Sequence, residues 1–207
     1  MLTKHHVSWG VVCLLQSGGH GARLLYSSEN KVVAQDKLHL LFQGRRVTFF
    51  FILAEAQMKI GDLLTEEFIA PDLKGSNKYE VIEELLDVLV KNGKIKDREL
   101  ALKDLIEREQ YLSTGLESGL AVPHAKTAAV EELLLSFGLS RNGLDFETLD
   151  GKPAHFIFLV LSPRDTSGPH IKVLAQITRN FREGGIGPQL MNSHSKAEIL
   201  EIIRNFK

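Results

Sequence analysis

The sequence predicts an α/β fold in which helices pack on a β-sheet. Apolar runs typical of strands alternate along the chain with segments whose apolar residues recur at helical spacing, and this interleaving favours helices on a sheet. The composition, with 43% hydrophobic and 25% charged residues among 207, is typical of globular proteins. This length is sufficient for one well-filled domain with an extension.

The segment that follows Met58 predicts a short strand and then a helix. Residues 68–73 are a strand-like apolar run that Pro71 interrupts. Ser76 is a suitable N-cap for the helix, and Gly93 supplies its C-terminal stop. Between them, apolar residues recur at helical spacing: Tyr79, Ile82, Leu85, Leu86, Leu89 and Val90.

A second helix and two strands are predicted next. The helix is capped by Asp97 and ends near Arg108 and Glu109, and its buried side carries Leu100, Leu102, Leu105 and Ile106. Residues 133–139 and 154–161 are strand-like. The second of these runs is apolar enough for a central strand, which is covered on both faces.

Two further helices complete the predicted fold. The first begins at residues 167–169, a Ser-Gly-Pro sequence, and carries Ile171, Val173, Leu174, Ile177 and Phe181. The second is capped by Ser195 and faces inward with Ile199, Leu200, Ile202 and Ile203.

Residues 1–57 differ in character from residues 58–207. The first part shows no sustained helical or strand periodicity, whereas the sequence from Met58 onward is typical of a natural protein start. We therefore expect residues 1–57 to be an extension of doubtful structure, derived from a start codon assigned too early or from an expression tag. Residues 58–207 are predicted to form the folded domain.

Charge and composition exclude several classes of function. A formal net charge of −1 gives no electrostatic reason to expect nucleic acid or an anionic membrane as the main partner. Cys13 is the only cysteine, so no internal disulfide forms, as expected of a protein in the reducing cytoplasm. No apolar run approaches the length of a transmembrane helix, so we expect no direct membrane insertion and a cytoplasmic location.

The pair Pro123-His124, which follows a glycine-containing loop and a short apolar run from Leu120 to Val122, is the main candidate for chemistry. Proline suits the first position of a helix or turn. His124 would then lie where backbone N–H groups and the positive end of a following helix can hold an anion. A histidine presented in this way can carry a phosphoryl group. The alternative is a surface histidine after a turn proline.

Upstream residues offer groups that could hold such an anion. Arg108 lies 16 residues before His124 and could grip phosphoryl oxygens with its guanidinium, although a solvated helix-end cation is also common. Gly115 and Gly119 could let backbone N–H groups approach a phosphoryl group, or could simply be turn residues. Hydroxyls in the same loop, on Ser113, Thr114 and Ser118, could donate hydrogen bonds or be ordinary loop residues.

His170 repeats the placement of His124, because it follows Pro169 and opens a predicted helix. It could stabilise charge on a phosphoryl group carried by His124, or be a surface residue at a helix start. His155, beside a strand, is predicted to be structural, and His194 lies in a loop. No histidine spacing supports a metal site.

These motifs resemble the IIA domain of the bacterial phosphoenolpyruvate-dependent phosphotransferase system, of the fructose/mannitol class that includes nitrogen-regulatory IIA proteins. The family signature is an R-E pair, an S-T-G loop and then A-I-P-H. This chain has Arg108-Glu109, a loop from Ser113 to Gly119, and Ala121-Val122-Pro123-His124. A later S-G-P-H-I-K-V-L-A motif spans residues 167–175. The resemblance covers about residues 58–207.

The resemblance implies a single IIA-like domain with a mixed sheet flanked by helices. It also implies that His124 is the phosphorylated nucleophile, assisted by Arg108 and His170. A phosphoryl-binding loop would contain Thr114, Gly115, Ser118 and Gly119. Glu117 and Ser118 stand where the signature often has Gly-Asn, and the role of Glu117 is open.

The function implied is that of a phosphocarrier in sugar uptake of the fructose type. It would accept a phosphoryl group from the phosphocarrier protein HPr on His124 and pass it to a IIB domain, without cofactor or metal. The alternative is a nitrogen-regulatory protein, in which phosphorylation of His124 switches binding to kinases, channels or transcription factors.

Overall fold

The computed structural model describes five strands near the N-terminus and then residues 59–183 and 185–206. The chain divides into two units, Met1–Gln57 and Met58–Lys207. In the first unit an antiparallel sheet has the order β1-β2-β3 and a hairpin pairs β4 with β5. These strands are β1 (Thr3–Val7), β2 (Val11–Gln16), β3 (Arg23–Ser27), β4 (Leu38–Phe42) and β5 (Arg45–Phe49). The expected origin of residues 1–57 stays a prediction.

The second unit is built on a mixed five-stranded sheet, as the resemblance implied. Its order is β6-β9-β10-β7, with β8 also paired to β10. The strands are β6 (Ile69–Ala70), β7 (Leu120–Ala121), β8 (His124–Lys126), β9 (Leu134–Leu144) and β10 (Ala154–Ser162). β10 runs antiparallel to β9 and parallel to β7 and β8, which confirms the expected central strand.

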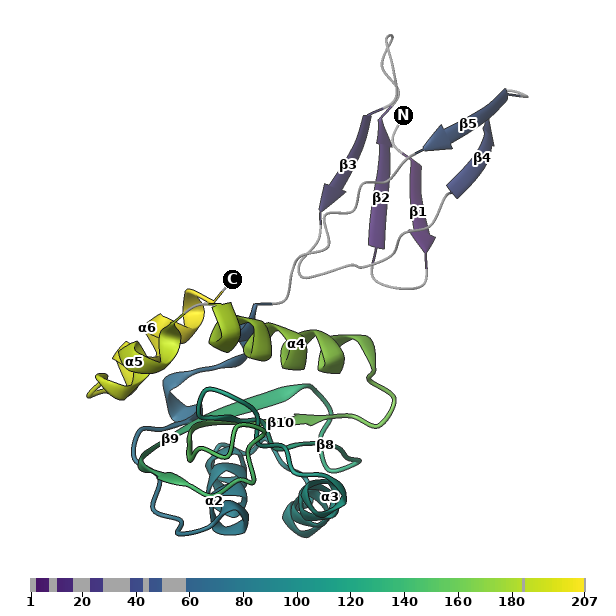
Figure 1. Ribbon diagram of the computed structural model, residues 1–207. Helices are drawn as coiled ribbons and strands as arrows, with labels where there is room; N and C mark the ends of the chain where they lie inside the picture. Colours follow the sequence, from purple (N-terminus) through teal and green to yellow (C-terminus); the bar gives the residue numbers. More distant parts are fainter. Residues whose placement is uncertain are drawn as a thin grey trace. The chain divides into compact units, whose positions relative to one another are not determined.

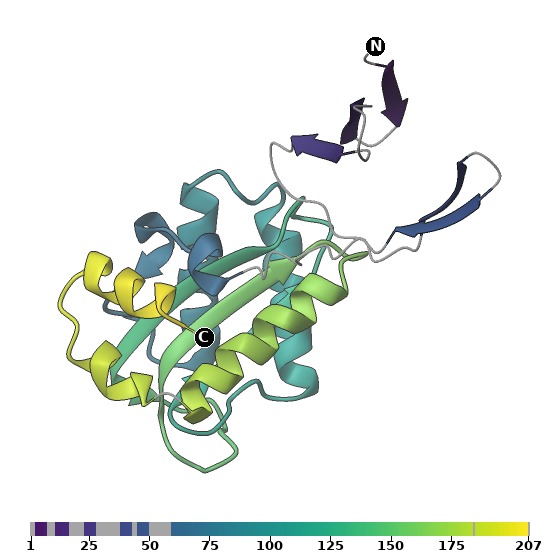
Figure 2. The same ribbon diagram turned by 90° about the horizontal axis from the view of Figure 1, so that it is seen from above.

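Helices cover both faces of this sheet (Figure 1). On one side lie α2 (Lys78–Lys91) and α3 (Arg98–Tyr111), and on the other α4 (Gly168–Glu183), α5 (Ile186–Met191) and α6 (Lys196–Arg204). The view from above shows α4 lying along β10 (Figure 2). A short helix α1 (Ile60–Leu63) and a 3-10 turn η1 (Glu66–Phe68) precede β6. Among the described residues, none of the helices combines the length and apolarity needed to span a bilayer.

The core lies on both faces of β9 and β10. Phe137 and Phe158 are both buried, with ring centroids 4.7 Å apart across the two strands. Phe158 also contacts Phe181 of α4, at 5.9 Å between centroids. Because helices cover both faces, β10 is apolar along almost its whole length, as a central strand requires.

The helix caps partly differ from the prediction. Asn77, and not Ser76, caps α2, and its side chain accepts hydrogen bonds from the N–H groups of Tyr79 and Glu80. Ser76 lies one residue earlier and donates both its N–H and its hydroxyl to Glu80. Gly93 ends α2 with φ +67°, as predicted. Asp97 and Ser195 cap α3 and α6 as predicted.

Other boundaries also needed correction. The predicted strand at residues 68–73 is reduced to Ile69–Ala70, because η1 includes Phe68 and the strand ends before Pro71. The second helix continues past Glu109 to Tyr111. The short helices α1 and α5 were not predicted, since four and six residues are too few for a helical period to emerge.

The corrected cap of α2 can be tested by two substitutions at adjacent residues. We expect Asn77→Ala to lower the free energy of unfolding by about 1 kcal/mol, the usual cost of losing an N-cap side chain. Ser76→Ala should cost less, because the Ser76 N–H still donates to Glu80. Urea unfolding of both variants measures the difference. Equal losses, or a larger loss for Ser76→Ala, would contradict the assignment of Asn77 as the cap.

Candidate functional site

His124 begins a strand and does not follow the start of a helix. It pairs with Val160 of β10, and the Pro123 carbonyl accepts the Val160 N–H at 2.9 Å. Proline therefore joins β7 to β8 without loss of strand pairing, since only its carbonyl is needed there. Of the two expected alternatives, a helix or a turn, the helix is wrong, because His124 begins β8. The helix start near His124 is instead that of α4, which carries His170.

The His124 ring is held in one tautomer. Its Nδ1 lies 2.8 Å from the carbonyl oxygen of Val122, and a carbonyl oxygen can only accept, so Nδ1 carries the proton. In the neutral ring, Nε2 then has a free lone pair. The pKa of His124 is lowered, chiefly by burial and also by the charge of Arg108. The Val122 carbonyl and Glu109 act in the opposite direction but do not cancel this effect. The neutral, nucleophilic form is therefore favoured at neutral pH.

His170 lies beside His124, with ring centroids 5.5 Å apart and planes inclined by 58°. It is buried, and its Nδ1 is 2.8 Å from the hydroxyl of Ser162 on β10. Burial, followed by the charges of His124 and Lys126, lowers the pKa of His170 to about 4. The structure thus brings together two neutral histidines that lie 46 residues apart in the sequence.

Arg108 is the third predicted residue at this site. It lies in the last turn of α3, and its Nη1 donates to the carbonyl of Leu112 at 2.7 Å. Its positive charge acts on His124, lowering the pKa of that ring after burial has done so. The bond to Leu112 fixes the guanidinium where α3 ends and the loop begins.

Glu109, the neighbour of Arg108, organises the loop that follows α3. Its carboxylate is buried and accepts the Thr114 N–H at 3.2 Å, the Thr114 hydroxyl at 2.5 Å and the Ser113 hydroxyl at 3.1 Å. Lys78 of α2 lies 3.6 Å from the same carboxylate. The sequence reasoning used Glu109 only as part of a motif. A carboxylate four and five residues before Ser and Thr is the signal that could have revealed this role.

Thr114 connects Glu109 to the strand that carries His124. Its carbonyl accepts the Val122 N–H at 3.1 Å, and the Val122 carbonyl in turn faces Nδ1 of His124. Gly115 allows the loop to pack closely, since a Cβ there would lie 2.4 Å from the Phe146 carbonyl oxygen. Thr114 and Gly115 therefore have a structural role next to the site.

Ser118 and Gly119 lie at the opposite end of the β7–β8 edge. Leu120 pairs with Phe156 and His124 pairs with Val160. Because these partners are four residues apart on β10, Leu120 and His124 are separated by about 13 Å along the strand. Ser118 and Gly119 precede Leu120 and adopt positive φ values of 62° and 71°. The Ser118 N–H donates to Asp150. The structure does not bring these two residues of the predicted loop together with His124.

Lys126 is a cation of the site that the sequence reasoning missed. It lies two residues after His124 on β8, so both side chains project from the same face of the strand. Its Nζ donates to the Ser167 hydroxyl at 3.0 Å, just before α4, and its charge acts on His170. The i, i+2 spacing would have revealed Lys126 if residues 124–126 had been predicted as a strand.

His155 and His194, the other two histidines of the second unit, lie away from this site. His155 is near Gly143 and places Nδ1 2.8 Å from the Ser140 carbonyl, in keeping with a structural role. His194 lies in the loop before Ser195. Within residues 59–183 and 185–206, no three His, Cys, Asp or Glu side chains are grouped as metal ligands.

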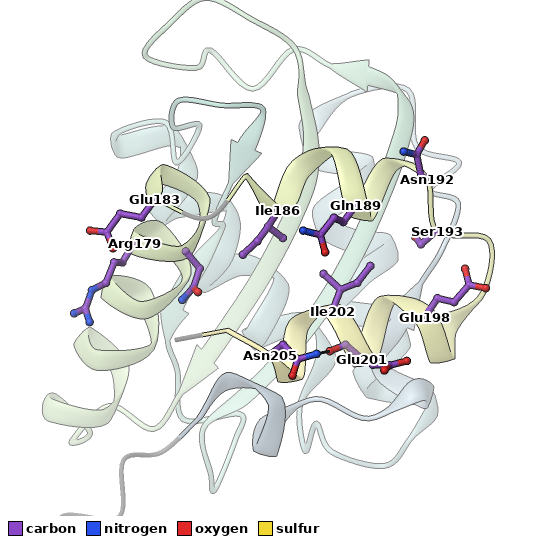
Figure 3. A pocket seen from close by; sticks show the side chains of 11 residues that line it. Arg179, Glu183, Ile186, Gln189, Asn192, Ser193, Glu198, Glu201, Ile202 and Asn205 are labelled. Carbon is purple, nitrogen blue, oxygen red and sulfur yellow. Dashed lines mark hydrogen bonds between the residues drawn. The ribbon is translucent and has the colours of Figure 1, made fainter.

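A cleft of about 780 Å³ lies between α4, α5 and α6 (Figure 3). Polar side chains line much of it, among them Arg179, Glu183, Gln189 and Glu201. No candidate site residue contributes to it. His124 and its neighbours therefore lie outside this cleft.

Comparisons with known proteins identify the family and the fold of the second unit. The family described as "Phosphoenolpyruvate-dependent sugar phosphotransferase system, EIIA 2" matches residues 62–206. A fructose-specific EIIABC component of Bacillus subtilis is 37% identical over 146 residues, which are 70% of this chain and 23% of that relative. The chain thus spans about a quarter of that relative's length.

Two relatives are closer in size to the second unit. A fructose-specific EIIA component of Haloferax volcanii is 34% identical, over 66% of this chain and 89% of its own. The crystal structure of the nitrogen regulatory protein IIA-Ntr from Neisseria meningitidis is 31% identical, with a TM-score of 0.61, covering 70% of this chain and 98% of that one. Relatives of both kinds therefore share this fold.

The buried carboxylate of Glu109 can be tested by Glu109→Gln. We expect the free energy of unfolding to fall by about 2 to 4 kcal/mol, because the substitution removes the negative charge 3.6 Å from Lys78 and places an amide N–H₂ opposite the Thr114 donors. Glu107→Gln, on the exposed side of the same helix, should change stability by no more than about 0.5 kcal/mol. Urea unfolding distinguishes the two. A loss of similar size in both variants would exclude the role given to Glu109.

Stability should also depend on pH through His170. Its pKa of about 4 lies below the ordinary value of 6.5, so between these values the unfolded chain binds a proton that the folded protein excludes. Stability is therefore complete above the unfolded pKa and decreases as pH falls toward the folded one. Between about pH 7 and about pH 4.5, we expect the free energy of unfolding to fall by about 2 kcal/mol more in the wild type than in His170→Asn. Urea unfolding at a series of pH values measures this difference. Parallel pH profiles would contradict the depressed pKa.

Proposed function

The chain belongs to the EIIA type 2 family of the phosphoenolpyruvate-dependent sugar phosphotransferase system, and we propose that it carries a phosphoryl group on Nε2 of His124. Members of this family are phosphotransferase components. The observation that carries the proposal is the hydrogen bond from Nδ1 of His124 to the Val122 carbonyl, because it leaves Nε2 as the nitrogen with a lone pair.

The proposed reaction is a direct transfer between histidines. The N–P bond of the phosphohistidine on the donor, HPr, breaks as a new N–P bond forms to Nε2 of His124. The phosphorylated ring gains positive charge, and the Val122 carbonyl stabilises the Nδ1–H of that ring. The same steps in reverse order pass the group to an acceptor. Such a reaction depends on in-line positioning and charge stabilisation more than on acid–base help.

Cations and donors around His124 support this role. Arg108 offers a planar guanidinium at the end of α3, which can hold two phosphoryl oxygens. His170, in the first turn of α4, can donate one hydrogen bond to the group. Lys126, on the same strand face as His124, adds a further positive charge. Thr114 and Gly115 act indirectly, because they fix the loop beside Val122 and not the phosphoryl group itself.

The surroundings of His124 suit a protein partner. Leu112 and Ile171 are large apolar side chains with 64% and 63% of their surface exposed. Leu112 accepts the hydrogen bond of Arg108, and Ile171 follows His170. An open site bordered by exposed apolar side chains fits the docking of another protein better than the enclosure of a small sugar. We accordingly assign HPr as donor and a IIB domain as acceptor, in the cytoplasm.

Two destinations for the phosphoryl group have support among the relatives. The fructose-specific EIIA and EIIABC components favour sugar uptake. The nitrogen regulatory protein IIA-Ntr, at 31% identity over nearly its whole length, favours a regulatory role in which the phosphorylation state changes binding to a target protein. We propose sugar uptake first, because the identity to the fructose-specific relatives is somewhat higher.

Labelling tests the proposed chemistry. With radioactive phosphoenolpyruvate, enzyme I and HPr, we expect the wild type to gain acid-labile, base-stable phosphate and His124→Ala to gain none, since the nucleophile is absent. His194→Ala, which removes a loop histidine outside the site, is the matched control and should label fully. Equal labelling of wild type and His124→Ala would exclude His124 as the acceptor.

The same labelled protein distinguishes the two destinations. Mixed with a fructose-type IIB domain, it should lose its label to that domain if it serves sugar uptake. Retention of the label on His124, together with capture of a regulatory target by only one phosphorylation state, would favour the nitrogen-regulatory role instead.

A further inference from the structure

We propose that Ser162 is a positioning residue that sets the tautomer of His170, so that Nε2–H of His170 points away from Ser162 as the free donor. This inference deepens the proposed function and rests on it, because the donor matters only if His124 carries a phosphoryl group. Ser162 lies at the end of β10, and neither the family motifs nor the sequence reasoning singled it out.

The first step is that the Ser162 hydroxyl has one partner. Ser162 is fully buried, and its Oγ lies 2.8 Å from Nδ1 of His170. The backbone carbonyl of Ser162 is engaged separately, by the Thr127 N–H at 2.9 Å. In the described part of the chain, the only hydrogen-bond partner of the Ser162 hydroxyl is Nδ1 of His170.

The second step decides which partner donates. If Nδ1 of His170 carried the proton, the Ser162 hydroxyl would accept it, and the hydroxyl's own proton would be buried without an acceptor. If the hydroxyl donates, Nδ1 accepts and both groups are satisfied. Buried donors without partners are rare and destabilising. The hydroxyl therefore donates to Nδ1, and the single proton of the neutral ring sits on Nε2.

The third step concerns charge. His170 is neutral near pH 7, since burial and the neighbouring charges keep its pKa at about 4. The groups that face it from adjacent elements are His124 and Lys126 of β8 and Ser162 of β10. A neutral ring has only one N–H, so the tautomer decides whether His170 can donate at all in the direction of His124.

The two histidines are then complementary. His124 is held by a carbonyl that only accepts, which leaves Nε2 free to attack. His170 is held by a hydroxyl that donates, which leaves Nε2–H free to bind a phosphoryl oxygen. With ring centroids 5.5 Å apart, the His170 ring is near enough to interact with a group bound to His124. Removal of Ser162 would weaken this donor without touching the nucleophile.

Nitrogen NMR of the unphosphorylated protein tests the tautomer directly. Wild-type His170 should show an Nδ1 without hydrogen and an Nε2 with hydrogen, and in Ser162→Ala the opposite tautomer should become populated. The matched control is Ser136→Ala, which removes a buried hydroxyl on the neighbouring strand that bonds the Leu85 carbonyl. It should leave the His170 signals unchanged. Ser162→Thr keeps the hydroxyl and should restore the wild-type tautomer.

The rate of phosphoryl transfer from HPr provides the second readout. We expect Ser162→Ala to slow labelling of His124 by about five- to tenfold, as for one neutral hydrogen bond, while Ser136→Ala and Ser162→Thr label at the wild-type rate. A wild-type His170 protonated on Nδ1 would overturn the inference, and so would an unchanged tautomer in Ser162→Ala. Absence of label on wild-type His124 would instead refute the proposed function and leave the NMR result to decide the tautomer.

Discussion

The buried carboxylate of Glu109 is the interaction on which the candidate site depends. A charge in this position must be satisfied by hydrogen bonds and an opposite charge, and Thr114, Ser113 and Lys78 supply them. Burial lowers the pKa of Lys78, but its hydrogen bond to Glu147 and the charges of Glu109 and Glu147 outweigh this effect and raise the pKa above the usual value. Lys78, the partner of Glu109, therefore stays charged. This fixes the loop against α2 and α3.

From Glu109 a series of hydrogen bonds continues to His124. The Thr114 N–H and hydroxyl donate to the carboxylate, the Thr114 carbonyl accepts the Val122 N–H, and the Val122 carbonyl accepts Nδ1–H of His124. Each bond leaves the next group with little freedom of orientation. The tautomer of His124 is thus linked to a carboxylate fifteen residues earlier in the chain, on a different secondary-structure element.

Sequence reasoning found the four longer helices, the central strand, and Arg108 and His170 beside His124, because each has a local signal. Asp97 precedes a periodic helix, residues 154–161 are apolar except for His155, and Pro-His occurs twice. It failed where pairing across the sheet decides the outcome. His124 begins a strand because β10 offers it a partner in Val160, and Ser118 and Gly119 lie far from it because the loop runs along β10. Lys126 and Ser162 were missed for the same reason, since only the β8–β10 register brings them opposite each other.

That register also fixes the side chains of the site relative to one another. Ser162 pairs with Lys126 and Val160 with His124, so the residues that hold His170 and the strand that carries His124 are fixed by the same hydrogen-bonded ladder. A shift of one residue would turn His124 and Lys126 to the opposite face. Because the apolar faces of β10 are buried under helices on both sides, such a shift would expose core side chains. The burial of β10 therefore holds the two histidines in place.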